Sequence, residues 1–145
     1  PYGDDALPSG NAVAIRALLE LGRLLDAPRY IDSATRALRA GMTDAGRWPS
    51  AHATLMRALL DVEQPPARVI VRAATAVPAA WQRAVEAGLD ARGRLYAIPH
   101  GEPLPGRLAT LQPSPGAGVT AWLQRGATTS AAITTLDALG AALDA

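Results

Sequence analysis

The chain has 145 residues, 49% of them hydrophobic and 19% charged, and its 14 basic and 13 acidic residues leave a formal net charge of +1. This composition predicts a folded chain of one ordinary domain or two small ones, and it argues against intrinsic disorder. A charge so close to neutral creates no field that would attract a polyanion, so we expect no nucleic-acid partner.

Neither cysteine nor lysine occurs in the sequence. The absence of cysteine excludes disulfides, thiolate metal ligands and thiol nucleophiles, and the absence of lysine excludes a lysine-dependent phosphate loop. Charged residues interrupt the most apolar stretch, 12–25, so we expect no membrane span and no membrane partner. We therefore expect a soluble, cytoplasmic protein without metal or cofactor. Its opening residues, Pro1-Tyr2-Gly3, lack an initiator methionine, and from this we expect a processed chain or a piece of a longer one.

The first predicted helix spans 12–25 and follows four residues of turn and capping character, Pro8-Ser9-Gly10-Asn11. Its polar residues Arg16, Glu20 and Arg23 recur at spacings of four and three, so they form one narrow stripe. Apolar side chains cover the rest of the circumference. Such a helix is expected to need neighbours on several sides.

Two further helices are predicted in the first half of the chain. Asp26 is a candidate N-cap for a helix over 29–40 that ends at Gly41, and the short connection predicts an antiparallel hairpin. Ser50 is a candidate cap for a third helix, which Pro65 stops. The sequence therefore predicts a helical part over 1–65.

The residues from 66 onward change in character and predict a small α/β part over 66–145. A buried strand is expected at 69–71, followed by a helix over 78–87 and a second strand at 94–98, which is a β-α-β pattern. A long loop separates these from a third strand at 119–125. Thr134 to Asp137 matches a capping box that opens the last helix. The predicted fold class is mixed α and β, with about three strands.

One polar constellation predicts a binding site. Asp4 and Asp5 precede Ser9 and Asn11, so two carboxylates, a hydroxyl and an amide gather at the start of the first helix. Paired carboxylates could perform acid/base chemistry on a sugar, and free N–H groups at a helix start favour polar or anionic ligands. Plain capping of the helix explains the same four residues, and both interpretations stay open.

Other chemical signals are weaker. His52 and His100 are the only histidines and lie far apart without metal-ligand spacing, so structural or exposed roles are expected for both; His100, in a loop, is the better candidate. The glycine-containing stretch 116–121 fits a loose dinucleotide pattern, but it enters a predicted strand instead of opening a helix. The three tryptophans are too dispersed to form a sugar platform, so core packing or partner contact is expected for each.

The string from Asp4 to Ala14 resembles a segment of the YyaL-type, spermatogenesis-associated thioredoxin-domain proteins, in which a Pro-Ser-Gly-Asn stretch begins a late helix. The later order is also similar to that family, with a valine-rich strand at 69–71, a proline-bounded strand at 96–99 and a terminal strand at 120–123. Members of the family carry cysteines shortly after the terminal strand, whereas 126–133 has none here.

This resemblance implies a parent with an amino-terminal thioredoxin-like domain and an (α/α)6 toroid similar to N-acylglucosamine 2-epimerases and cellobiose epimerases. The chain would be its carboxyl-terminal portion, with terminal toroid-type helices over 1–65 and an α/β cap. Structural completion without independent catalysis is the leading hypothesis, with the missing amino-terminal remainder or an oligomer mate as partner.

The resemblance also implies that Ser9 and Asn11 lie near the toroid mouth, where related proteins bind carbohydrate-like ligands. One alternative is that the parent is a sugar epimerase or isomerase, with Asp4 and Asp5 joining these two residues in its pocket. Another alternative is a protein-interaction module that docks a partner through the apolar first helix and the tryptophans.

Overall fold

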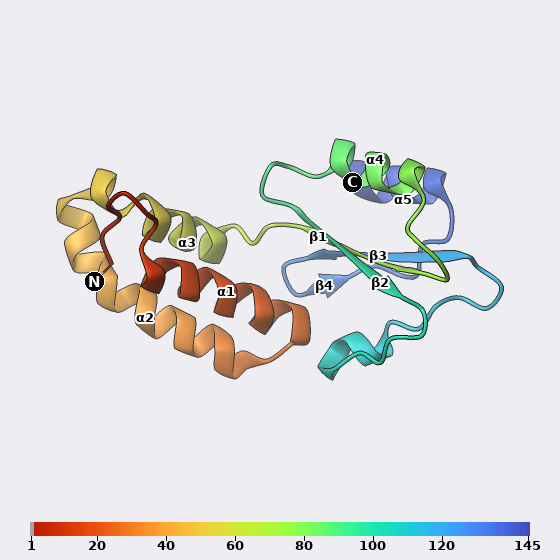
Figure 1. Cartoon of the computed structure of the whole chain (residues 1–145), viewed down its shortest axis with the longest axis horizontal. Helices are drawn as coiled ribbons and strands as arrows, with labels where there is room; N and C mark the ends of the chain where they lie inside the picture. The colour runs from red at the N-terminus through yellow and green to blue at the C-terminus, as the bar shows by residue number, and fades with distance from the viewer. Residues whose placement is uncertain (1) are drawn as a thin grey trace. The chain divides into compact units, whose positions relative to one another are not determined.

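The computed structural model describes residues 2–145 and has a mixed α and β fold, as predicted (Figure 1). Its contacts divide the chain into two compact units, Pro1–Pro65 and Pro66–Ala145. Within the described residues, three of the five α-helices belong to the first unit, and a four-stranded sheet belongs to the second. Each unit has its own hydrophobic core.

The first unit consists of helices and one short 3₁₀ turn. Its elements are α1 (Gly10–Leu25), α2 (Pro28–Arg47), η1 (Pro49–His52) and α3 (Ala53–Glu63). Helices α1 and α2 run antiparallel as the predicted hairpin, and α1 also packs against α3 (Figure 1). The core contains mostly leucine and alanine: Ala12, Ile15, Leu19, Ala34, Leu38, Ala45, Leu55 and Ala58.

The connection between α1 and α2 corrects a prediction. Asp26 does not cap the second helix but ends the first, with φ 54° and ψ 49°, and its N–H donates to the Gly22 carbonyl. Aspartate tolerates this left-handed conformation better than most residues do, because its short polar side chain bonds locally. Helix α2 begins after Ala27, which provides no side-chain cap.

The end of α2 corrects a second prediction, because the helix passes through Gly41 and continues to Arg47. A Cβ atom at Gly41 would lie 2.7 Å from Leu55 Cδ2 and 2.8 Å from Tyr2 Cδ1. The glycine therefore permits close packing inside the helix and is not a stop signal. Ser50, the predicted cap of the third helix, lies instead within the turn η1.

The outer side of α1 remains exposed. Val13 and Leu21 are 49% and 39% exposed, and Ala14 and Ala17 are exposed as well. These four residues form the outer stripe of α1, opposite the buried residues that face α2 and α3.

No helix in the described part of the chain has the length and apolarity needed to cross a membrane.

Within the described residues, the second unit contains one mixed sheet, one short 3₁₀ turn and two α-helices. Its elements are β1 (Arg68–Ala73), α4 (Ala79–Gly88), β2 (Arg94–Pro99), η2 (Gly106–Thr110), β3 (Val119–Arg125), β4 (Thr128–Thr129) and α5 (Leu136–Asp144). The strand order is β2-β1-β3-β4. β1 and β2 are parallel, which confirms the predicted β-α-β pattern, and β3 is antiparallel to β1. The two-residue strand β4 was not predicted.

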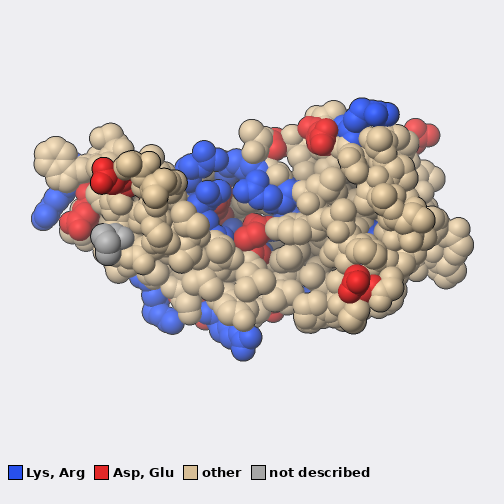
Figure 2. Space-filling model, in the orientation of Figure 1, with Lys and Arg blue, Asp and Glu red and all other residues tan. Residues whose placement is uncertain are grey.

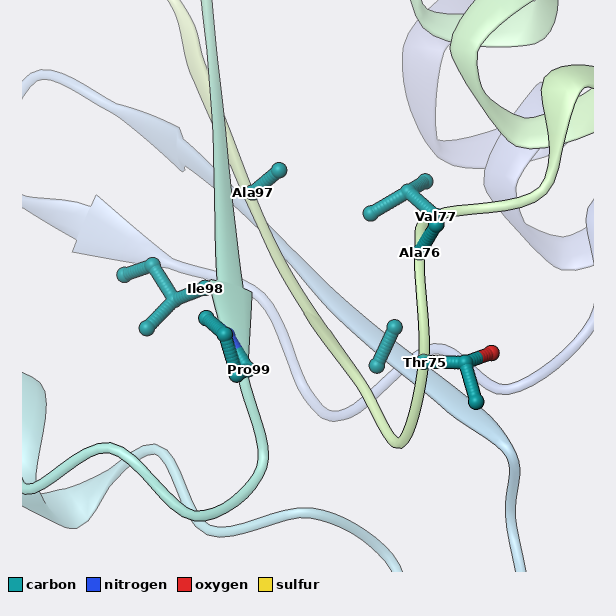
Figure 3. A pocket seen from close by; sticks show the side chains of 7 residues that line it. Thr75, Ala76, Val77, Ala97, Ile98 and Pro99 are labelled. Carbon is teal, nitrogen blue, oxygen red and sulfur yellow. The ribbon is translucent and has the colours of Figure 1, made fainter.

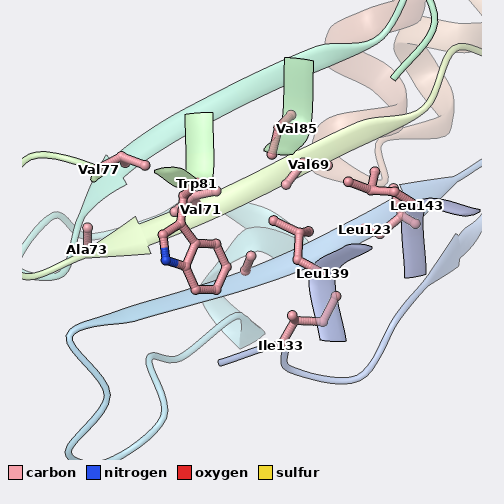
Figure 4. Packing of buried hydrophobic residues seen from close by; sticks show 11 residues of the cluster. Val69, Val71, Ala73, Val77, Trp81, Val85, Leu123, Ile133, Leu139 and Leu143 are labelled. Carbon is pink, nitrogen blue, oxygen red and sulfur yellow. The ribbon is translucent and has the colours of Figure 1, made fainter. Parts of the chain in front are cut away.

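Helices α4 and α5 cover one face of this sheet (Figure 4). Alternate residues of β1 point toward them, and Trp81 of α4 and Leu139 of α5 complete the core. All six residues of β1 are buried, so the strand is covered on both faces. Thr135, not Thr134, caps α5, because its hydroxyl accepts the N–H of Ala138.

Candidate functional site

The carboxylate of Asp4 joins the starts of two helices. Its Oδ1 accepts the N–H of Ser9 at 2.8 Å, and its Oδ2 accepts the N–H of Thr54, in the first turn of α3, at 2.7 Å. The N–H of Asp4 itself donates to the Ala51 carbonyl at 2.7 Å. His52, immediately before α3, makes no side-chain capping bond. Asp4 therefore supplies the N-terminal cap of α3 from a segment fifty positions earlier in the chain.

Ser9 extends this arrangement to α1. It is the N-cap of that helix, and its buried hydroxyl accepts the N–H of Ala12 at 3.4 Å. Because Asp4 holds the Ser9 amide, the carboxylate fixes the position of the capping residue. Two of the four predicted site residues are thus brought together, and the capping interpretation accounts for the contacts of both.

The pKa of Asp4 is held below its ordinary value. The N–H groups of Ser9 and Thr54 stabilise the carboxylate most strongly, the Thr54 hydroxyl and the nearby His52 act in the same direction, and burial opposes them. Asp4 is therefore ionised at neutral pH, with both oxygens already accepting hydrogen bonds. A general acid must carry a proton at its working pH, so this environment suits a cap better than acid catalysis.

Asp5 and Asn11 lie on the surface of the same region. Asp5 is exposed and its N–H donates to the Leu7 carbonyl at 3.1 Å. Asn11 is exposed in the first turn of α1. The assignment of these residues to a ligand site stays a prediction.

The two histidines belong to different units. His52 is buried, and its Nδ1 lies 2.8 Å from the Trp48 carbonyl, which can only accept, so Nδ1 carries the proton. His100 is half-buried, and its Nε2 is enclosed without a hydrogen-bond partner. Across residues 2–145, no three His, Asp or Glu side chains gather closely enough to hold a metal ion.

Arg72 forms a polar centre that the sequence analysis missed. The residue is 3% exposed, and its guanidinium donates to the carbonyls of Leu111, Pro99, His100 and Glu102 at 3.3, 3.0, 2.6 and 2.8 Å. These bonds attach the loop after β2 to the centre of the sheet. The sequence did contain a signal for this centre, since Arg72 directly follows the β-branched run of a predicted buried strand. A charge inside a buried strand requires several hydrogen-bond acceptors.

A small cavity of about 160 Å³ opens at the carboxyl ends of β1 and β2 (Figure 3). Ala97 and Val77 point toward each other across it, whereas Ile98 points away (Figure 3). The lining is almost wholly apolar: Ala73, Thr75, Ala76, Val77, Ala97, Ile98 and Pro99. The carboxyl ends of parallel strands are where α/β proteins commonly bind ligands. This cavity was not predicted from the sequence, because its small residues carry no chemical signature.

Charged side chains of both signs appear on the visible face of each unit (Figure 2), in keeping with the net charge of +1.

Comparison with known proteins identifies no relative, since no family model, curated protein or solved structure matches the chain. Membership of the YyaL-type family therefore stays a prediction from the sequence.

Proposed function

We propose that the chain provides packing surface to a YyaL-type protein, completing its (α/α)6 toroid with terminal helices and an α/β cap, without catalysis of its own. The outer stripe of α1 is the observation that carries this proposal. A helix that is apolar nearly all round is normally enclosed by neighbours, yet Val13 and Leu21 are 49% and 39% exposed.

The geometry of the stripe suits a further helix. Val13, Ala17 and Leu21 follow one another at intervals of four residues, which places them along one ridge of α1. Alanine at the middle position lets another helix approach closely, while the larger residues on either side fill its grooves. Helices α2 and α3 already cover two sides of α1, and the stripe offers a third side to a further helix of the toroid.

The proposal also includes a ligand, which would bind at the exposed start of α1. Asp5 and Asn11 offer a carboxylate and an amide to a carbohydrate-like molecule at the toroid mouth, beside the structural pair Asp4 and Ser9. An epimerase or isomerase parent would use the same residues.

Titration of the parent protein with N-acetylglucosamine and with cellobiose tests whether a carbohydrate binds there. We expect Asp5→Asn to abolish any binding, because it removes the carboxylate. Equal binding by the variant, or none by the parent, would remove the carbohydrate from the proposal.

A protein-interaction module is the second candidate, and Trp48 is the observation in its favour. This residue follows α2 as its C-cap and is 69% exposed, and large exposed aromatic side chains are common anchors of interfaces. If the chain binds a separate partner in this way, Trp48→Ala should weaken association as strongly as Leu21→Gln does. If the chain associates through α1 alone, as the toroid proposal states, Trp48→Ala should not change the strength of association.

Light scattering and thermal unfolding of the isolated chain test the leading proposal. We expect concentration-dependent association and binding of an apolar dye, both reduced by Leu21→Gln. Leu136→Gln is the matched control, because Leu136 has a similar exposure of 38% but lies in the second unit. A highly stable monomer that binds no dye would contradict the proposal.

A further inference from the structure

The strand β2 lies at one end of the sheet order and has β1 as its only neighbour among residues 2–145. The N–H of Arg94 donates to the Ala67 carbonyl at 3.0 Å, and the N–H of His100 donates to the Ala73 carbonyl at 2.9 Å. Backbone groups alternate in direction along a strand, so the even-numbered residues of β2 turn toward β1. The odd-numbered residues turn their N–H and C=O groups outward.

Two residues are left with unpaired main-chain groups by this alternation. Leu95 and Ala97 each present one N–H donor and one C=O acceptor to the outer side, and Ala97 is exposed. Pro99 closes the edge at its far end, because it has no N–H and its carbonyl already accepts from Arg72 and from the N–H of Glu102. The edge therefore offers a short window of four hydrogen-bonding groups.

The cavity of about 160 Å³ lies directly beside this window, since Ala97 is part of its lining. A residue added opposite Ala97 would place its side chain on the same face of the sheet, where Ala97 and Val77 face each other (Figure 3). A cavity of roughly this size accommodates one benzene molecule, so one leucine, isoleucine or phenylalanine side chain fits.

Arg94 supplies a charge at the start of the strand. Its side chain is exposed and donates a long hydrogen bond of 3.5 Å to the adjacent Gly93 carbonyl. It lies on the face of the sheet opposite the side chain of Ala97, because three positions separate the two residues. A carboxylate on an added strand, opposite Arg94, would complement this charge.

We propose that the outer edge of β2 and the adjacent cavity form a docking site for an extended peptide segment that adds to the sheet as an antiparallel strand. The segment carries a branched or aromatic apolar residue for the cavity, followed three residues later by an acidic residue that faces Arg94. Four main-chain bonds to Leu95 and Ala97 provide the general affinity, and the two side chains provide the specificity.

A second copy of β2 satisfies these requirements less well. Antiparallel self-pairing centred on Tyr96 would make the same main-chain bonds between Leu95 and Ala97 of the two copies. However, Leu95 already packs against its own core and is not available to fill the cavity of the other copy. Arg94 would face the apolar Ile98, so its charge would stay without a complement.

Fluorescence anisotropy with the labelled peptide Ser-Thr-Leu-Thr-Val-Glu-Thr-Ser tests the proposal on the full chain. Its leucine is placed opposite Ala97 and its glutamate opposite Arg94. We expect saturable binding that weakens about tenfold or more in Ala97→Pro, which removes an outward N–H at an edge position where proline is tolerated. Ala97→Leu, which fills the cavity but keeps the N–H, should weaken binding as well, whereas Ala80→Leu on the exposed surface of α4 should not.

The charge contact has its own control. Arg94→Gln should weaken binding of the glutamate peptide several-fold but leave binding of a glutamine peptide unchanged, because the coupling needs both partners. N-methylation of the peptide leucine should abolish binding without any change to the protein. Circular dichroism verifies that each variant is folded.

Absence of saturable binding, or equal binding by a folded Ala97→Pro variant, would overturn the proposal. Dimerisation of the chain that Ala97→Pro abolishes would assign the edge to a second copy instead. Leu21→Gln should not alter peptide binding, so this test is independent of the function proposed for α1.

Discussion

The carboxylate of Asp4 accepts the N–H of Thr54 at 2.7 Å although the two residues are fifty positions apart. This contact links the segment before α1 to the first turn of α3, and the bond from Ser9 to the other carboxylate oxygen extends it to α1. A residue that resembles one half of a catalytic carboxylate pair thus caps α3 and holds Ser9, the residue that caps α1.

Replacement of Asp4 should therefore destabilise the helical unit. Asp4→Ala removes both acceptors and leaves the Ser9 and Thr54 amides without them, so we expect Tm to fall by several degrees in thermal unfolding followed by circular dichroism. Asp5→Ala is the matched control, because it removes an exposed neighbouring carboxylate and should leave Tm almost unchanged. Equal effects of the two substitutions would show that Asp4 is not a cap.

The contribution of Asp4 should also depend on pH. Because folding lowers the pKa of this carboxyl below its ordinary value of 3.8, the stabilisation is complete above that value and is lost as pH falls through the lower folded pKa. Denaturant unfolding of wild type and Asp4→Asn should give a difference in unfolding free energy that is constant near neutrality and shrinks in strong acid. A difference that grows on acidification would contradict the assignment.

Two glycines within α2 should respond in opposite directions to the same substitution. Gly41→Ala forces a methyl group against Leu55 and Tyr2 and should cost about 1–3 kcal/mol of unfolding free energy. Gly46→Ala meets nothing within 4 Å and should stabilise the helix by up to about 1 kcal/mol. Chemical unfolding of the two variants measures both values. A neutral or stabilising Gly41→Ala would contradict the close packing described above.

Arg72 should prove necessary for order in the loop after β2. Arg72→Met removes a buried guanidinium that donates to four carbonyls, so we expect a loss of about 2–4 kcal/mol and faster proteolysis within 99–111. Arg83→Met, on the exposed surface of α4, serves as the control. Unchanged proteolysis of the loop in Arg72→Met would mean that other contacts order it.

Local patterns in the sequence predicted the elements whose signals are contiguous. Such signals predicted β1, from its β-branched run, and the helix that contains Trp81 and Val85. The order strand, helix, strand is typical of two parallel strands, and β1 and β2 pair in this way. The prediction failed at helix boundaries, where one residue type serves several purposes. Gly41 is required for packing and not for termination, and Asp26 ends one helix instead of starting the next.

Long-range contacts could not be predicted from the sequence. The cap of α3 comes from Asp4 and not from the nearby Ser50, and only the folded hairpin of α1 and α2 brings that carboxylate to the helix start. The edge window at Leu95 and Ala97 likewise depends on the strand order. Neither feature has a local sequence signature.

The accessibility of residue 13 tests the central claim about the outer stripe of α1 most directly. Since the chain has no cysteine, Val13→Cys introduces a single thiol within it, and site-specific mass spectrometry measures its labelling rate. We predict fast labelling of this cysteine in the isolated chain and strong protection when the longer parent protein carries the same substitution, while Ala80→Cys labels rapidly in both. Equal labelling rates of the cysteine introduced at Val13 in the isolated chain and in the parent protein would contradict the claim that further helices cover α1.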